Sequence, residues 1–396
     1  MTTKNASNPL KVATALVAAL LFGLGAAVLW PRLSGEATAE PVDAAADAQG
    51  AQAGAVSPAL AAGSGAAQRQ GPKPANDVIP MPGCWSGTLE FDRHISMENF
   101  RRALDNAIHA GDRFLATYLQ ERLTDLVGQD AGRALQVLEW AKQASGPALG
   151  IYMDALKASA AIHHPQVVEQ VLKMGEDKGA TLLHRGAAMD VLEVQKNFNP
   201  ATLARMKAIA LDESLDSVSW IATRSIGRVM KTEYENSGDF KPYWNELLNI
   251  SEKSDDMAVR QLALEMPSYF DPLLDKDSMD RLNRLMVNDT ERDVREKAAH
   301  RLAFTEDPSK SLEYYREAFG KEHDICMRWA LMRFAFRAVG PEALPLAAQF
   351  AQQDPRLARD YEDFKKLYAD GTTDWTRIWP DKAEYHNCIV EEGAPH

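Results

Sequence analysis

From Ser96 onward the sequence repeats an amphipathic pattern about every thirty-five residues. Apolar side chains recur three and four positions apart, which places them on one face of a helix. Gly-Asp, Gly-Pro, His-Pro, Asn-Pro and Asp-Pro pairs separate these stretches. A near-constant period predicts an all-α fold, an α-solenoid of about seven to eight hairpins of ~35 residues, with short non-helical caps at 85–95 and 372–391. The aligned positions, 32 to 41 residues apart, are Leu115, Ile151, Leu183, Val218, Val259, Val294 and Met327.

The clearest copies lie between residues 250 and 340. Asp256-Met-Ala-Val-Arg260 aligns with Arg292-Asp-Val-Arg295, and more loosely with Asp324-Ile-Cys-Met-Arg328. A Val-Arg pair between an acidic residue and an alanine resembles the second helix of HEAT repeats. Before residue 200, tetratricopeptide-like hairpins fit about as well, and a helical bundle with chance Val-Arg pairs is the alternative throughout.

In HEAT repeats an aspartate and an arginine six positions later form a polar ladder between repeats. The resemblance therefore implies a role for side chains at matching positions in consecutive copies. These inter-repeat ladder residues are Asp289 with Arg295, and Arg260 and Arg328, with Ser254 and Glu322 at the acidic position of their copies.

Near the N-terminus, Val12 to Trp30 gives nineteen residues without a charge. As a helix the run would span ~28 Å, about the thickness of a hydrocarbon core. A cleaved signal peptide is the alternative, but its apolar region is usually about 7–15 residues long and is followed closely by an Ala-x-Ala site. The nearest such tripeptide begins at Ala37, seven residues beyond Trp30. The sequence therefore favours a transmembrane anchor at 12–30.

The charges around this run predict its orientation. Lys4 and Lys11 precede it, acidic residues dominate after it, and positive charge stays in the cytoplasm. We expect a cytoplasmic tail at 1–11, followed beyond the anchor by a disordered Ala/Gly/Pro tether at 31–80, which holds hardly any large apolar side chain. The exported α-solenoid domain is 81–396, which predicts a single-pass inner (cell) membrane protein with this domain in the periplasm.

The charge balance bears on the partner. The chain has a formal net charge of −12, all of it in residues 81–396. Such a surface repels nucleic acid and anionic lipid headgroups. The expected partner is a protein or peptide in the cell envelope, with no nucleic acid, and with the membrane engaged through the protein's own anchor.

Three cysteines are present: Cys84, Cys326 and Cys388. An exported domain lies where disulfides persist. The two ends of a solenoid are normally farther apart than the ~7 Å Cα separation that a disulfide allows. This favours a Cys326–Cys388 bridge over Cys84–Cys388, and three reduced cysteines are the remaining alternative.

Motifs for chemistry are missing from the sequence. There is no Cys-x-x-Cys, no His-x-x-x-His pair on one helix face, no glycine-rich phosphate loop and no Gly-x-Ser-x-Gly elbow. We therefore expect no catalytic residue, no metal and no cofactor, and predict a scaffold or adaptor that binds its partner through a helical-repeat surface. The alternatives are a murein-acting enzyme, whose superhelical relatives need a Glu-Ser motif that only Glu213-Ser214 offers, and a chaperone-like subunit near the secretion channel.

Overall fold

The computed structural model describes residues 94–212, 214, 217–266 and 274–369. The chain divides into two compact units, 1–103 and 104–396. The described part of the first unit, residues 94–103, contains the start of α3 (Met97–His109). The expected anchor, tether and C-terminal cap lie outside the described residues, as does most of the N-terminal cap. Within the described part of the chain, no helix is both long and apolar enough to cross a membrane.

Residues 104–369 form α-helices joined by short loops. The odd-numbered helices are α5 (Ala131–Gln143), α7 (Pro165–Glu176), α9 (Pro200–Ala210), α11 (Lys241–Lys253), α13 (Lys276–Asn288), α15 (Pro308–Lys321) and α17 (Leu344–Gln353). The even-numbered helices are α4 (Arg113–Val127), α6 (Gly146–Ala158), α8 (Leu182–Leu192), α10 (Ser217–Ser237), α12 (Met257–Glu265), α14 (Arg292–Arg301), α16 (Ile325–Val339) and α18 (Ala358–Ala369). Short 3₁₀ turns lie at Ala160–His163, Gly340–Ala343 and Pro355–Leu357.

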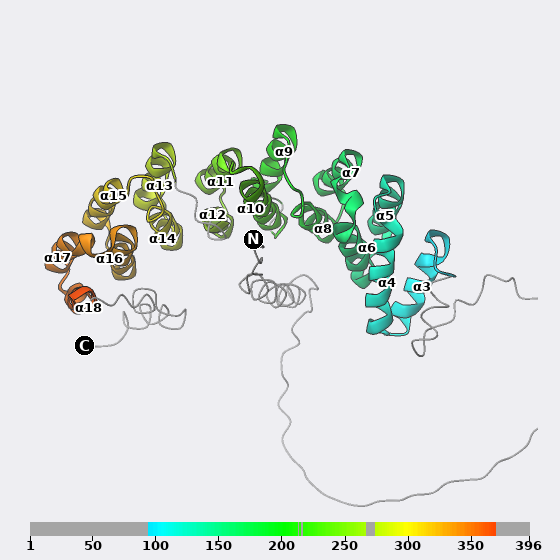
Figure 1. Ribbon diagram of the computed structural model, residues 1–396, viewed down its shortest axis with the longest axis horizontal. Helices are drawn as coiled ribbons and strands as arrows, with labels where there is room; N and C mark the ends of the chain where they lie inside the picture. The colour runs from blue at the N-terminus through cyan, green and yellow to red at the C-terminus, as the bar shows by residue number, and fades with distance from the viewer. Residues whose placement is uncertain (1–93, 213, 215–216, 267–273, 370–396) are drawn as a thin grey trace, which may run out of the picture. The chain divides into compact units, whose positions relative to one another are not determined.

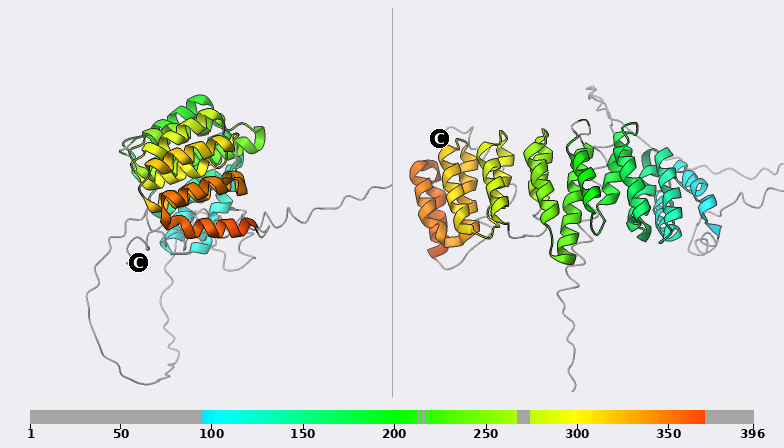
Figure 2. Two further views of the ribbon diagram at one scale, coloured as in Figure 1. Left: turned by 90° about the vertical axis from the view of Figure 1, so that its left-hand side faces the viewer. Right: turned by 90° about the horizontal axis from the view of Figure 1, so that it is seen from above.

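The helices of the second unit form two rows. Each odd-numbered helix from α5 to α17 packs against the even-numbered helix that follows it, making a hairpin. The odd-numbered helices α5 to α17 also pack against one another in chain order, and so do the even-numbered helices α4 to α16 (Figure 1). Seen from above, neighbouring helices run side by side (Figure 2). This architecture confirms the predicted all-α solenoid, and in the described residues extended backbone pairs only at one bridge, between Leu274 and Thr305.

Local sequence explains where the helices begin and end. Asp256 caps α12 by accepting hydrogen bonds from the amides of Ala258 and Val259, and aspartates cap α4, α5, α13, α15 and α16 in the same way. Proline occupies the first position of α7, α9 and α15, where its missing N–H costs nothing. Gly340 follows α16 at φ 62°, a backbone conformation that residues with a Cβ rarely adopt.

The aligned repeat positions fall in the even-numbered row, but two of them, Ile151 in α6 and Leu183 in α8, are not buried. Val218, Val259, Val294 and Met327 are fully buried in α10, α12, α14 and α16. Leu183 in α8 is 36% exposed, so the copy centred there is out of register. Val259 lies three positions after its capping residue and Leu183 only two after its own, which turns Leu183 toward the helix surface.

Candidate functional site

The loops that lead from each odd-numbered helix to the next even-numbered helix form one edge of the second unit. We call these loops, together with the first turn of the helix that follows each of them, the loop edge. Hydrogen bonds join the last four of these loops to one another, as the ladder contacts below show. The first loop residues in order are Ala144, Asp177, Leu211, Ser254, Asp289, Glu322 and Asp354.

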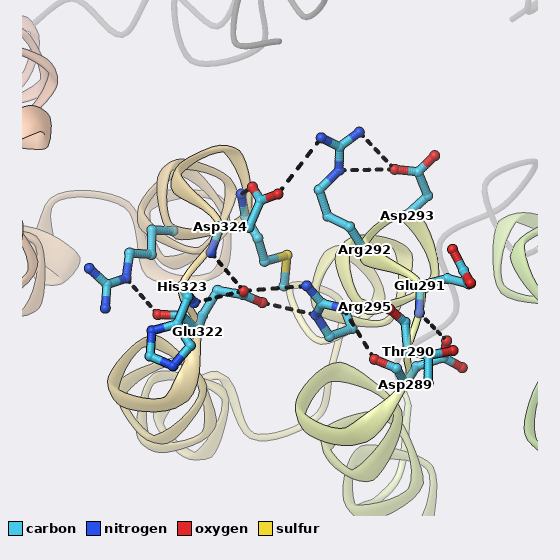
Figure 3. Close-up of polar contacts among 11 residues, drawn as sticks. Asp289, Thr290, Glu291, Arg292, Asp293, Arg295, Glu322, His323 and Asp324 are labelled. Carbon is cyan, nitrogen blue, oxygen red and sulfur yellow. Dashed lines mark hydrogen bonds and ion pairs between the residues drawn. The ribbon is translucent and has the colours of Figure 1, made fainter. Parts of the chain in front are cut away.

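Arg295 links two of these loops (Figure 3). Its Nη1 donates to the backbone carbonyls of Asp289 at 3.1 Å and Thr290 at 3.2 Å, which lie in the loop of its own hairpin. Its Nε and Nη2 donate to the carboxylate of Glu322, at 2.9 and 3.3 Å, in the loop of the next hairpin. One guanidinium therefore holds its own loop and the following loop together.

Arg260 repeats this arrangement one hairpin earlier. Its Nη1 donates to the carbonyls of Ser254 at 3.1 Å and Asp255 at 3.2 Å. Its Nε and Nη2 each lie 3.1 Å from a carboxylate oxygen of Asp289. The bond to the carbonyl six positions back and the pair with the next loop are the same as those of Arg295.

Arg328 makes the third contact of this kind. We call each contact between an arginine of one hairpin and a carboxylate of the next hairpin a rung of the ladder. Its Nε donates to the carbonyl of Glu322 at 2.8 Å, and its Nη1 lies 3.0 Å from the carboxylate of Asp354. Arg356, two residues beyond Asp354, bonds both oxygens of the same carboxylate, at 2.9 and 2.7 Å. The structure thus brings together Arg260, Asp289, Arg295, Glu322 and Arg328 in one series and adds Asp354 to it.

Two carboxylates of the ladder, those of Glu322 and Asp354, have a lowered pKa. Burial acts to raise the pKa of Glu322, but hydrogen bonds from the amides of Asp324 and His323 and from Arg295 outweigh it, so this pKa lies below its usual range. The hydrogen bond from the Arg356 side chain, with that from Arg328, holds the pKa of Asp354 well below its usual range. The ladder is therefore a set of charged contacts, bidentate at Arg260 and Arg295 and single at Arg328, which are stronger than neutral hydrogen bonds.

The ladder begins at Arg260 in α12, and α10, one hairpin earlier, does not take part in it. Val218 is fully buried like Val259, so Ser219 stands where the later hairpins have an arginine. The Ser219 hydroxyl donates to the backbone carbonyl of Asp212 at 3.0 Å, seven positions back in its own loop. The loop of the next hairpin offers Ser254 where the others offer a carboxylate. Both partners of the charged pair are therefore replaced by serine at this position.

A cavity of about 180 Å³ lies between the loop that precedes α10 and the loop that precedes α12, where no rung forms. Polar side chains from two successive loops line it: Asp212, Ser219, Ser254, Asp255 and Asp256. A hydrogen bond from the Ser214 side chain, with smaller contributions from the charges of Lys178 and Arg185, lowers the pKa of Asp212. The cavity is thus bordered by carboxylate groups where the rungs hold a guanidinium.

A second cavity, of about 530 Å³, lies farther toward the N-terminus on the same edge. Lys142, Lys173, Asp177, Thr181 and His184 contribute its polar lining. The His184 ring, through Nε2, lies 2.9 Å from the carbonyl oxygen of Ala144 in the preceding loop. This cavity mixes positive and negative groups, which sets it apart from the acidic cavity at Ser219.

Exposed large apolar side chains also collect on the loop edge. Among the described residues there are four: Phe114 at 76%, Leu182 at 46%, Met257 at 38% and Leu183 at 36% exposure. Each lies at the first or second position of an even-numbered helix, α4, α8 or α12. Leu182 and Leu183 flank residues of the larger cavity, and Met257 follows Asp256 of the smaller one.

One cysteine of the described residues, Cys326, lies in the first turn of α16 on this edge. It is nearly buried and is disulfide-bonded. Cys84 and Cys388 both lie outside the described residues, so the pairing of Cys326 with Cys388 stays a prediction. In the described ranges, no three His, Cys, Asp or Glu side chains come together as a metal site would require.

Several residues of the loop edge were not identified from the sequence. Asp354 lies 32 residues after Glu322, so one further step of the period would have found it. Ser219 carries a weaker signal, because a serine is noticed only when an arginine is expected there; Ser254, by contrast, was already placed at the acidic position of its copy. The exposure of Phe114 and Met257 follows from where α4 and α12 begin, which the apolar spacing alone leaves uncertain by a residue or two.

Comparison of the chain with known protein families, with curated proteins and with solved structures finds no match.

Proposed function

We propose that this protein is a membrane-anchored scaffold of the cell envelope that binds a protein or peptide partner along the loop edge of a HEAT-like solenoid. The observation that carries the proposal is the placement of the exposed apolar side chains. Phe114, Leu182, Leu183 and Met257, the exposed large apolar residues of the described chain, all lie at the first turn of an even-numbered helix.

This placement favours a binding surface over scattered exposure. Single exposed apolar side chains are normal on a protein surface, but several in one register along one edge mark an interaction site. Aromatic and methionine side chains are enriched at the centres of protein interfaces, and Phe114 and Met257 belong to these types. The two cavities beside these residues would receive polar groups of the partner and give the contact its specificity.

The ladder supports the HEAT-like assignment over a tetratricopeptide-like one. Arg260 and Arg295 each lie six positions after the residue whose carbonyl they bind, and each pairs with a carboxylate of the next hairpin. Such a series fixes the spacing between the hairpins from α11 to α18, and it supports the part of the edge that begins at Met257. A rigid row of contacts costs less conformational entropy on binding than a flexible one.

The anchor and tether complete the proposal. A flexible coil of fifty residues, 31–80, has a root-mean-square span of ~40 Å. It would keep the solenoid near the membrane at effective concentrations that reach the millimolar range for a partner held there. The proposed topology, with residues 1–11 in the cytoplasm and 31–396 outside, is tested by fusing alkaline phosphatase after residue 60, which should give an active reporter. An inactive reporter would reverse it.

The binding proposal is tested by crosslinking in intact cells that produce the full chain. A photo-reactive residue is placed at Phe114, Leu183 or Met257, and at the exposed control positions Lys196 and Asn236, which lie toward the other ends of the even-numbered helices. We expect the same discrete adduct from the three loop-edge positions and none from the controls. Equal adducts from both sets, or from neither, would contradict a binding site on this edge.

A second arm separates binding from folding. Replacing Phe114, Leu183 and Met257 together by aspartate changes exposed side chains only, so circular dichroism and the melting temperature should stay close to wild type. The variant should lose the adduct and fail to complement a deletion strain. Complementation at wild-type level would show that these side chains are not needed for function.

A further inference from the structure

The acidic cavity between Ser219 and Ser254 lies one hairpin before the first rung of the ladder. At the three rungs that follow, an arginine of the solenoid fills the space between two loops. One hairpin earlier the chain supplies Ser219 in place of the arginine, and a cavity of about 180 Å³ remains. Ser219 can therefore be compared with the residue at the same position in the three hairpins that follow, which is an arginine in each.

The hydrogen-bond acceptors that a guanidinium needs are still present. Asp255 and Asp256 line the cavity from the loop before α12, and Asp212 lines it from the loop before α10. Asp256 uses one oxygen to cap α12, with the amide of Ala258 at 2.7 Å. A carboxylate offers about four acceptor positions on two oxygens, so these groups keep acceptor capacity beyond the bonds they already make.

The charges of the described residues around the cavity leave it acidic. Lys178 lies 3.7 Å from Asp212 and its side chain is 80% exposed, so solvent screens this pair. Arg260 approaches the same loop but bonds the carbonyls of Ser254 and Asp255 and the carboxylate of Asp289. Arg185, whose charge also contributes to the lowered pKa of Asp212, donates its Nε to the carbonyl of Gly175 at 2.7 Å. Three carboxylates of the described residues therefore border the space, and Arg185 and Arg260 donate hydrogen bonds to groups other than these carboxylates.

The volume limits what can enter. Sites for whole small molecules are usually about 300–1,000 Å³, larger than this cavity. One side chain with a planar, forked donor group matches both the size and the acceptors, and arginine presents that fork to carboxylates better than lysine does. The net charge of −12 would also attract a basic segment toward this face.

We propose that this cavity receives an arginine side chain of the bound partner, whose guanidinium takes the place of the missing ladder arginine. The inference rests on the proposed function and names its partner class: a peptide segment that carries an arginine beside an apolar residue. The arginine would enter between the two loops while the apolar neighbour contacts Met257, which follows Asp256 and is exposed.

The test measures binding of a fluorescently labelled peptide, acetyl-Gly-Leu-Arg-Leu-Gly-amide, to the full chain in detergent by fluorescence anisotropy. The matched peptide has citrulline, which keeps the shape of arginine without its charge. We expect the citrulline peptide to bind about tenfold more weakly or worse, because hydrogen bonds between charged groups are lost. Equal binding of the two peptides would overturn the inference.

Variants locate the binding. Ser219→Arg supplies the missing arginine from the solenoid itself, so it should abolish peptide binding while leaving the melting temperature unchanged or raised. Lys196→Ala, at an exposed position that lines neither cavity, is the control that should leave binding unchanged. Undiminished binding to Ser219→Arg would place the peptide elsewhere and overturn the inference.

If Ser219→Arg does not fold, Asp255→Asn replaces it as the test. Asp255 is exposed and caps no helix. Its substitution should therefore weaken the binding of the arginine peptide by about tenfold without affecting the binding of the citrulline peptide. An unchanged affinity for the arginine peptide would contradict the proposal.

The failure of this inference is distinguishable from failure of the proposed function. Phe114 and Leu183 lie on α4 and α8, away from this cavity on α10 and α12. If crosslinks form at Phe114 and Leu183 but the arginine and citrulline peptides bind alike, the loop edge binds a partner without an arginine in this cavity. If those crosslinks are also absent, the binding function itself is wrong.

Discussion

Arg260 and Asp289 meet across the boundary between two hairpins, with Nε and Nη2 of the arginine each 3.1 Å from one oxygen of the carboxylate. The backbone carbonyl of the same aspartate accepts from Arg295 at 3.1 Å. Asp289 therefore receives the arginine of the hairpin before it and supports the arginine of its own hairpin. Through this residue two neighbouring rungs share one loop.

Arg295→Ala should lower the free energy of unfolding by about 1–3 kcal/mol, because the Glu322 carboxylate and two loop carbonyls lose a donor in a largely buried setting. Urea denaturation of the full chain measures the loss. A double-mutant cycle with Glu322→Gln should show coupling between the two side chains. Independent, additive effects would mean that the pair contributes no more than its separate packing.

The ladder should weaken in acid. The pKa of Glu322 is lowered in the folded protein from an ordinary value of 4.5. Below about pH 4.5 the unfolded chain therefore binds more protons than the folded one, and acid favours unfolding. The stability that ionised Glu322 contributes is complete above this pH and is lost as the pH falls through its folded pKa.

The measurement compares the free energies of unfolding of wild type and Glu322→Gln between pH 7 and pH 3. We expect the difference to be constant down to about pH 5 and to shrink below it. Asp354→Asn should behave in the same way at slightly lower pH, because the ordinary pKa of aspartate is 3.8. A difference that is constant down to pH 3 would contradict the lowered pKa values.

Val294→Asp should destabilise the protein by several kcal/mol. Val294 is fully buried in α14, so the substitution would bury a charge without a partner. Val294→Ala is the matched control, because it removes methyl groups without adding charge and should cost much less. Thermal unfolding of both variants checks the order. A wild-type melting temperature for Val294→Asp would place this side chain at the surface.

Separating the solenoid from its anchor should abolish function while leaving the fold intact. A partner held by a few polar and apolar contacts would depend on the high local concentration that the proposed tether would provide. Export of residues 81–396 behind a cleavable signal is scored by complementation of a deletion strain. We expect failure, with a normal circular dichroism spectrum, and rescue by an unrelated transmembrane segment. Full rescue by the released domain would count against a tethered scaffold.

The sequence predicted the helical rows well because their cause is local and periodic. Val259 and Val294 recur at one period and are buried in successive helices of one row. The register at Leu183 could not be found in this way, since α8 begins at a different distance from its aligned residue. A start displaced by one residue rotates a helix by about 100° and exchanges a buried side for an exposed one.

The candidate site was less accessible to prediction. A pattern search finds residues that are present, such as Arg260 and Arg295. The cavity at Ser219 and Ser254 lies where two separate hairpins have serine in place of the arginine and the acidic residue of the pattern. Their connection becomes visible only when the loops lie side by side. For the same reason, the grouping of Phe114, Leu183 and Met257 on one edge needs the folded arrangement.

The rungs of the ladder all point one way along the chain. Arg260, Arg295 and Arg328 each take a carboxylate from the hairpin that follows. A hairpin duplicated within this stretch would bring both an arginine for its successor and an acid for its predecessor, so the array could lengthen without new contacts being invented. Removing a hairpin has different consequences at the two ends of the ladder. Loss of α17 and α18 would leave Arg328 without the carboxylate of Asp354. Loss of the hairpin before Asp289 would leave the Asp289 carboxylate without Arg260 but accessible to water.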